Sequence, residues 1–191
     1  MNIRKIITDI FSRIFNVTPS QWSRVSECWF ITFFFKIGAA IGWTIITAAF
    51  IAQFGISFLP FLLIVNAVLI IAGTLFFERL IVRMKREVLM ILMILFGATT
   101  LFFETFLYGK SPIAFFSLVV FAESVFLAQF NVFIPILVGD RFSPLESQKT
   151  FPIVESADTI GGIIGGALVG ILASRFAMGW FIYMWIGFLA F

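Results

Sequence analysis

Long apolar segments constrain the fold of this chain more than any other feature of its sequence. Five of them exceed the roughly 20 residues that a helix needs to cross a hydrocarbon core about 30 Å thick, and a sixth begins near Phe176. The expected spans cover residues 28–53, 58–80, 88–108, 112–138 and 153–174, and the segment from 176 onward. The sequence therefore predicts an all-α, polytopic membrane protein with six transmembrane helices.

The composition indicates lipid as the surrounding solvent. Apolar residues make up 61% of the chain and charged residues 12%, whereas soluble domains average roughly half and about a quarter. The single cysteine, Cys28, excludes an internal disulfide framework, and the chain has no histidine. We therefore expect no metal site, no cofactor and no catalytic residues. The net charge of +3 is too small to indicate a nucleic-acid partner.

Two parts of unequal length make up the chain. Residues 1–17 place isoleucine and phenylalanine at helical spacing with charges between them, which predicts an amphipathic interfacial helix; a frayed cytoplasmic tail is the alternative. Residues 18–191 form the transmembrane domain, and Thr18-Pro19-Ser20-Gln21 predicts the start of its first helix. From Phe176 onward 16 residues remain, or about 24 Å of helix. We therefore expect the given chain to end inside a membrane helix.

The basic residues predict the orientation in the membrane. Ten of the 13 lysines and arginines precede the first span or lie in the loops after the second and fourth spans. Lys110 and Arg175 fall on the other side, and Lys36 lies within a span. Because cytoplasmic loops carry an excess of lysine and arginine, we expect a cytoplasmic N-terminus in a cell inner membrane.

Two opposite charges lie at similar depths in the predicted spans. Glu123 follows Pro112 by 11 residues, roughly 16 Å from the outer surface, and Lys36 lies roughly 12 Å from the cytoplasmic side. In a core about 30 Å thick these depths nearly coincide, so the two side chains could meet. Intramembrane charges usually face a bundle interior or an aqueous cavity, because exposure to lipid is costly.

These charges and their neighbours form the predicted substrate path. Its members are Glu123, Lys36, Asn131, Trp43 and Thr47. The alternative is a structural Lys–Glu pair that holds two helices together, or a Lys36 side chain that extends to the interface.

A cytoplasmic gate is the second predicted site. The loop at 139–156 is rich in charge and lies on the same side as the basic loop at 78–87. Ion pairs between them could bias a balanced equilibrium between two states; a solvated face that obeys the positive-inside rule is the alternative. The predicted gate residues are Arg83, Arg86, Asp140, Arg141, Glu146, Lys149 and Asp158.

Glycines at helical spacing mark the fifth span. Small residues let helices approach closely, which drives helix association in lipid. The predicted packing strip, which also suits a sliding contact between two bundles, consists of Gly161, Gly162, Gly165, Gly166 and Gly170.

Residues 122–166 contain a set of motifs: Ala122-Glu123, Glu146-Ser147-Gln148-Lys149, Phe151-Pro152 and the glycine strip. This set resembles the fourth and fifth helices of the ATP/ADP translocase-like (nucleotide transporter) branch of the major facilitator superfamily. Residues 19–24 and 50–83 are also similar to that branch. The resemblance implies two six-helix halves that transport by alternating access. This chain would be the N-terminal half and would lack its C-terminal six-helix partner, and the glutamate matching Glu123 would be required for transport.

One departure from the family pattern leaves the substrate open. Nucleotide-exchanging relatives carry an Arg/Lys-Asp cluster late in the first helix, where this sequence has Thr44-Ile45-Ile46-Thr47. The predicted function is a secondary active transporter, not an enzyme, that exchanges either nucleotides or another organic anion or solute. The alternative is a non-transporting membrane scaffold, or a half-sized helix bundle that dimerises through the Gly-rich fifth span. The expected partners are the lipid bilayer and a small-molecule substrate.

Overall fold

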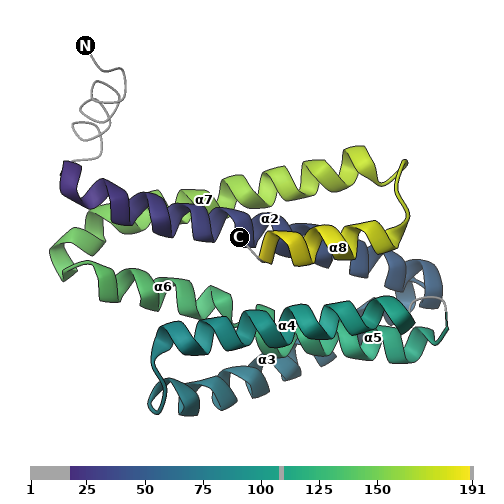
Figure 1. The fold of residues 1–191 in the computed structure, drawn as a ribbon. Helices are drawn as coiled ribbons and strands as arrows, with labels where there is room; N and C mark the ends of the chain where they lie inside the picture. Colours follow the sequence, from purple (N-terminus) through teal and green to yellow (C-terminus); the bar gives the residue numbers. More distant parts are fainter. Residues whose placement is uncertain (1–17, 108–109, 190–191) are drawn as a thin grey trace.

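A computed structural model describes residues 18–107 and 110–189 of the chain (Figure 1). Every regular element within these ranges is a helix, as the fold class predicted. The elements are α2 (Pro19–Phe54), η1 (Ile56–Phe58), α3 (Leu59–Ile81), α4 (Arg86–Leu107), α5 (Pro112–Phe121), η2 (Ala122–Leu127), α6 (Phe130–Arg141), α7 (Pro144–Leu172) and α8 (Met178–Leu189). The interfacial helix expected at 1–17 lies outside the described residues.

Five helical segments of the described chain are long and apolar enough to cross a membrane. They correspond in order to the first five predicted spans: Gln21–Phe54, Ile56–Ile81, Arg86–Leu107, Pro112–Arg141 and Pro144–Leu172. The sixth predicted span appears as α8, which is apolar but shorter. The structure thus shows an all-α chain with several helices of membrane-spanning length, whereas a total of six spans stays a prediction.

Matching capping boxes begin the first and fifth of these segments. At the start of α2 the Thr18 backbone N–H donates to Oε1 of Gln21 over 2.9 Å. At the start of α7 the Ser143 N–H donates to Oε2 of Glu146 over 2.8 Å, and the Glu146 N–H lies 3.4 Å from the Ser143 hydroxyl. These side chains satisfy backbone donors that the first turn of a helix leaves free.

The second capping box overturns one expectation. Residues 139–156 were expected to form a loop because they are rich in charge, but α7 already begins at Pro144 and α6 ends at Arg141. Ser143 and Glu146 supply the capping box, so helix formation starts well before the apolar part of the segment. The charged residues after position 143 therefore lie on the first turns of a helix.

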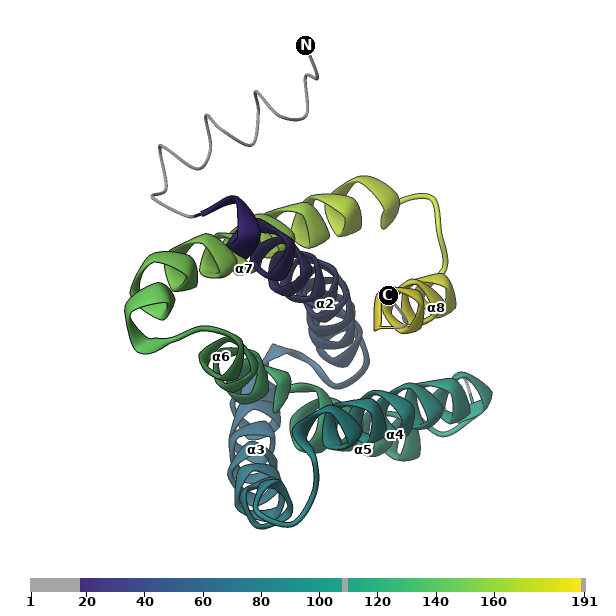
Figure 2. The same cartoon turned by 60° about the vertical axis from the view of Figure 1, so that its left-hand side comes forward.

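The helices form two groups (Figure 2). In one group α2 packs along α7, the most extensive helix contact in the described chain, and also against α8. In the other group the continuous segment of α5 and η2 packs against α3 and α4. Contacts between α4 and α8 join the two groups.

Glycines set the closest approaches between helices. A Cβ atom at Gly42 of α2 would overlap the ring of Trp185 from α8, whose side chain is 1% exposed. On α7, a Cβ at Gly161 or Gly165 would lie 2.7 Å from the carbonyl oxygen of Phe33 or Ile37 on α2. Because ordinary Cβ contacts are longer than this, any side chain here would push the helices apart.

The predicted glycine strip therefore has two faces. Gly161 and Gly165 lie against α2, whereas a Cβ added at Gly162, Gly166 or Gly170 would meet no described atom within 4 Å. One face brings α2 and α7 together, and the other is open.

Candidate functional site

An ion pair joins the middle of α2 to the middle of α7. Lys36 Nζ contacts Asp158 Oδ1, and the two side chains are 23% and 34% exposed. Lys36 lies about 25 Å along α2, counted from Pro19, and Asp158 about 21 Å along α7, counted from Pro144. The pair is therefore placed within both helices at membrane depth, with one side open.

This pair corrects the expected partner of Lys36. We expected Glu123 from the matching depths, but the structure places Lys36 against Asp158. Gly161 lies one turn beyond Asp158, and its position lets α2 approach until a Cβ there would be 3.0 Å from that of Lys36. The helix contact thus decides which carboxylate the lysine reaches. Asp158, assigned to the cytoplasmic gate, belongs to this intramembrane pair.

Glu123 lies in a turn of π-helix that interrupts the fourth span. Element η2 covers Ala122–Leu127, and its wider turn shows in the bond from the Ala128 N–H to the Glu123 carbonyl oxygen at 2.7 Å. Turns of this kind are rare and occur frequently at functional sites. The residue singled out by its charge is therefore also marked by the backbone.

Ser124 links this π-turn to α3. Its hydroxyl donates to Oδ1 of Asn66 and lies 3.4 Å from Oε2 of Glu123. Glu123 is thus connected through Ser124 to a polar side chain on the second span.

Gln129 makes a second link between the same elements. Its amide is 2% exposed, and its Nε2 donates to the carbonyl oxygens of Ser124 at 3.1 Å and Ile70 at 3.2 Å. The Thr74 hydroxyl lies 3.0 Å from its Oε1. Gly73 leaves the room for this amide, because a Cβ there would be 2.8 Å from Nε2. We call Asn66, Thr74, Glu123, Ser124 and Gln129 the α3–η2 polar cluster.

Sequence reasoning missed most members of the α3–η2 polar cluster. Asn66, Thr74 and Gln129 were not singled out, although each is a polar residue within an apolar span. Such residues are usually turned towards the bundle interior, so that signal was available. Their mutual contacts depend on which helices are neighbours, which a single sequence does not show.

The remaining residues of the predicted substrate path lie apart from Glu123. Asn131 is exposed on α6, and Trp43 and Thr47 are partly exposed on α2. The Thr47 hydroxyl is buried without a hydrogen-bond partner in the described chain. Within residues 18–107 and 110–189, no hydrogen bond or ion pair joins these three residues to Glu123.

The two capping boxes are connected where α2 and α7 begin. Gln21 donates its side-chain amide to Oε1 of Glu146, and Arg24 lies 3.8 Å from the same oxygen. Arg24 also donates to the backbone carbonyl of Arg141 over 2.6 Å and stacks over Phe142 at 5.1 Å from the ring centroid. Residues of α2 that were not predicted thus bind the predicted gate residues Arg141 and Glu146.

Further ion pairs close this end of the bundle. Arg141 lies 2.6 Å from Glu27 of α2, and Arg86 at the start of α4 pairs with Asp140 at the end of α6. The other predicted gate residues, Arg83 and Lys149, are exposed and have no ion pair among the described side chains. The end that carries most basic residues is thus held by side chains from α2, α4, α6 and α7.

A buried carboxyl group on α4 was overlooked. Glu104 is 0% exposed, and neither of its oxygens has a hydrogen-bond partner in the described chain. The signal was an acidic residue near the outer end of the predicted third span. It lies on a different element from the Lys36–Asp158 pair and the α3–η2 polar cluster, and at the opposite end of α4 from Arg86.

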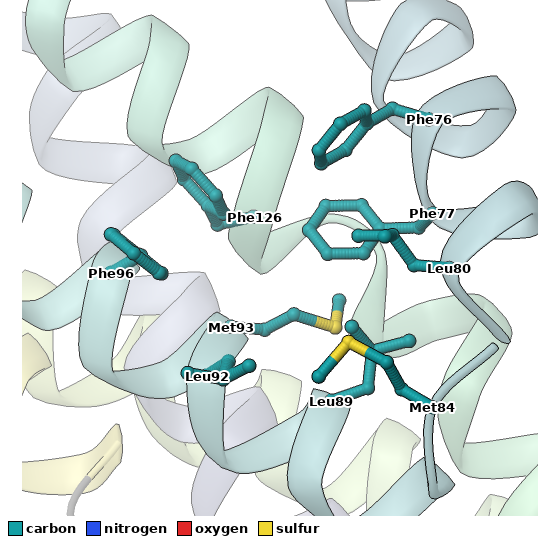
Figure 3. Close-up of a pocket in the computed structure, with 9 residues that line it drawn as sticks. All are labelled: Phe76, Phe77, Leu80, Met84, Leu89, Leu92, Met93, Phe96 and Phe126. Carbon is teal, nitrogen blue, oxygen red and sulfur yellow. The ribbon is translucent and has the colours of Figure 1, made fainter.

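An apolar pocket of about 230 Å³ lies between α3, α4 and η2 (Figure 3). Phenylalanine, leucine and methionine side chains line it, including Phe77, Met93 and Phe126, and no polar side chain does. Ligand sites combine apolar walls with a few polar groups that fix orientation. This pocket lacks such groups, so we assign it to helix packing.

The described residues contain no group of three or more His, Cys, Asp or Glu side chains able to hold a metal ion. Comparison of the chain with protein-family models, with curated proteins and with solved structures gives no match. The resemblance to the major facilitator superfamily accordingly stays a prediction.

Proposed function

We propose that this chain is the N-terminal six-span half of a secondary transporter of the major facilitator type, which moves an organic solute by alternating access. The observation that carries the proposal is the partly exposed ion pair of Lys36 and Asp158 at membrane depth. A charge at the bilayer centre costs about 2.5–3.5 kcal/mol on insertion scales, so such groups face an aqueous path or another protein element. A transport path between two halves supplies both an aqueous environment and a facing protein element.

The pattern of helix contacts supports this architecture. The first span packs on the fifth and sixth, and the fourth span packs on the second and third. If spans one to three correspond to spans four to six, these two sets of contacts are equivalent. Halves of major facilitator transporters are built from two such inverted three-helix repeats.

The polar contacts follow the same correspondence. Lys36 and Asp158 join the first span to the fifth, and Ser124 and Asn66 join the fourth to the second. In the proposed repeat these contacts join corresponding pairs of helices. We therefore place the Lys36–Asp158 pair and Glu123 on the same central path.

The ion pairs at the basic end suit a gate. The Arg86–Asp140 and Arg24–Glu146 pairs are partly exposed, and pairs of this kind contribute roughly 0–1 kcal/mol each. Bonds this weak can break and re-form while the protein changes state, yet together they favour the closed arrangement. We propose that this end faces the cytoplasm and that the protein lies in a cell inner membrane.

The scarcity of basic side chains within the spans limits the class of substrate that this half can bind. Lys36 is the one basic residue well inside the described spans, and Asp158 already neutralises it. A nucleotide triphosphate would therefore need cations from the second half. We keep ATP/ADP exchange as the narrower version of the proposal and another organic solute as the broader one.

Uptake into vesicles tests the proposal. The full-length protein is reconstituted into liposomes and offered labelled ATP, ADP and a panel of organic anions and neutral solutes, with and without internal counter-solute. We expect saturable uptake of at least one solute. Correctly inserted protein that moves none of them would overturn the transporter, whereas uptake of solutes other than nucleotides would remove the narrower version alone.

Glu123→Gln provides the matched variant for this assay. It keeps the size of the side chain and removes the charge, so we expect uptake to be lost while membrane insertion is unchanged. Glu155→Gln, at an exposed position on α7, is the control and should transport normally. Normal uptake by the Glu123 variant would exclude that residue from the path.

One observation favours the scaffold alternative. The open face of α7 at Gly162, Gly166 and Gly170 suits close packing against a second copy of the chain. A protein that transports nothing, runs as a dimer in detergent and becomes a monomer on Gly166→Leu would establish this alternative.

A further inference from the structure

Glu104 ends a line of buried residues on α4. Leu89, Met93, Gly97 and Leu101 precede it at intervals of three or four residues, which places all of them on one face of the helix. A Cβ at Gly97 would lie 2.7 Å from Leu127 of η2, so this face points into the bundle. The Glu104 carboxyl group is therefore enclosed by protein and not by lipid.

The neighbouring elements at this level bring no compensating charge. Helices α5 and α8 carry no acidic or basic side chain, and the one titratable group described on them, the Tyr183 phenol, is exposed. On η2 the titratable group is Glu123, which would repel a second negative charge and has its contact with Ser124. Lys110, just beyond the end of α4, and Arg175, between α7 and α8, are exposed and form no ion pair among the described residues.

The other charges near α4 lie at its far end. Arg86 and Glu87 are in its first turn, some 17 residues or about 26 Å from Glu104. The charges of α3 and α6 that approach α4 are Glu78, Arg79, Asp140 and Arg141, at the ends of those helices next to Arg86. None of them can neutralise Glu104.

An ionised carboxylate in this position would have no favourable partner among the described residues. Burial of an unpaired charge is far more costly than burial of the neutral acid, and a group so placed keeps its proton instead. A sodium or other metal ion would need several oxygen ligands, and the described chain has no acidic cluster that could supply them. The geometry thus favours a proton over a metal ion.

The position of Glu104 also suggests how the proton would be exchanged. It lies three residues before the end of α4, about 4.5 Å along the axis from the outer end of that helix. Helix α4 is also one of the elements through which one helix group contacts the other, at α8. Movement of the two groups relative to each other would open this contact and let water reach the carboxyl group.

We propose that Glu104 is a proton-binding site whose protonation changes during the transport cycle, which makes a proton the coupling ion. On release the O–H bond of the carboxyl group breaks, the proton passes to a water molecule and a carboxylate remains; on binding the same transfer runs backwards. The coupling role rests on the proposed transport function, whereas proton binding at Glu104 does not.

Infrared spectroscopy of the purified full-length protein tests the proton site directly. At neutral pH we expect a carbonyl band of a protonated carboxylic acid that shifts in deuterated water. The band should lose intensity in Glu104→Gln and keep it in Glu78→Gln, an exposed control on α3. A wild-type spectrum without that band, or a band of unchanged intensity in the Glu104 variant, would overturn the assignment. If Glu104→Gln does not fold, Glu104→Asp replaces it, and an unshifted band would then count against the site.

Proton flux in vesicles tests the coupling. With the solute identified by the uptake assay, wild-type protein should move protons together with solute and accumulate it against a gradient. Glu104→Gln should still exchange solute at equal concentrations but lose accumulation at least tenfold and release no protons. Proton movement that continues in this variant would refute the coupling role. A wild-type protein that transports nothing would remove the transport function and the coupling together, while the infrared band would still decide whether Glu104 holds a proton.

Discussion

Adjacent glycines on α7 allow a matched test of how α2 and α7 are held together. Gly161 and Gly162 are neighbours in the same helix, but they face different surroundings. A Cβ at Gly161 would lie 2.7 Å from the Phe33 carbonyl oxygen and 3.0 Å from the Lys36 Cβ, whereas one at Gly162 would meet nothing within 4 Å. Gly161→Ala and Gly162→Ala thus make the same chemical change in two environments.

The expected magnitudes follow from two opposing effects. Glycine to alanine within a helix is favourable by about 1 kcal/mol, because alanine has less backbone freedom to lose. At Gly161 the added methyl group also forces backbone and side-chain shifts, which cost typically 1–3 kcal/mol. We therefore expect Gly162→Ala to be neutral or slightly stabilising, and the two variants to differ by about 1–3 kcal/mol in free energy of unfolding.

Equilibrium unfolding in mixed micelles measures this difference. Titration of the two variants and the wild type with a denaturing detergent, followed by circular dichroism and tryptophan fluorescence, gives the three free energies under the same conditions. Gly161→Ala should also weaken the Lys36–Asp158 pair, so adding Asp158→Asn should cost less in that background than in the wild type. Equal stabilities for the two alanine variants would refute the packing of α7 against α2 through Gly161.

Three further outcomes are expected. Gly42→Ala should displace the Trp185 ring and lower the stability by about 1–3 kcal/mol, with a change in tryptophan fluorescence that Gly187→Ala, at a position with open space, does not produce. Asp158→Asn should destabilise the protein by about 1–3 kcal/mol, between the values typical of exposed and buried pairs, and Lys36→Gln in the same chain should restore most of the loss. If the double variant is no more stable than the Asp158→Asn variant, the loss of stability does not come from breaking the ion pair. Gln129→Leu removes the side-chain donor to the carbonyl oxygens of Ser124 and Ile70, although Ile70 keeps its bond from the Thr74 hydroxyl. Detergent unfolding should show a loss of about 1–3 kcal/mol for the two lost hydrogen bonds, and an unchanged midpoint would contradict the α3–η2 polar cluster.

Hydropathy and capping signals were sufficient to predict the helices but not their contacts. The five long spans follow from the length of their apolar segments, and the start of α2 follows from Thr18 and Gln21. The predicted start of the fifth span, at residue 153, is too late, because the segment before it is rich in charge and the capping box that Ser143 forms with Glu146 was not recognised. Charge and capping signals can thus favour different helix boundaries, and here the capping box determines where α7 begins.

The partners of the intramembrane charges could not be predicted from depth. Two residues at the same depth meet when their helices are neighbours and turned towards each other, and for Lys36 that neighbour is α7. The π-turn at Glu123 had no recognisable local signal, since the same residues could form an ordinary α-turn. Glu104 was visible as a charge in an apolar span, yet its complete burial depends on tertiary packing.

The π-turn also makes the exact number of residues in the fourth span part of the information that specifies the fold. The turn in η2 takes up one residue more than an α-turn, so the residues after it lie about 100° behind the positions that they would have in an uninterrupted α-helix. The buried side chains of α6, such as Phe130, Phe133 and Leu137, meet the bundle only with that offset. Deleting one residue from Ala122–Leu127 would let the turn close as an ordinary α-helix and keep the same face of α6 inward, whereas a residue inserted or deleted within α6 would turn the remaining part of that helix by about 100°. The fold therefore depends on the number of residues in each part of this span as well as on their chemical character.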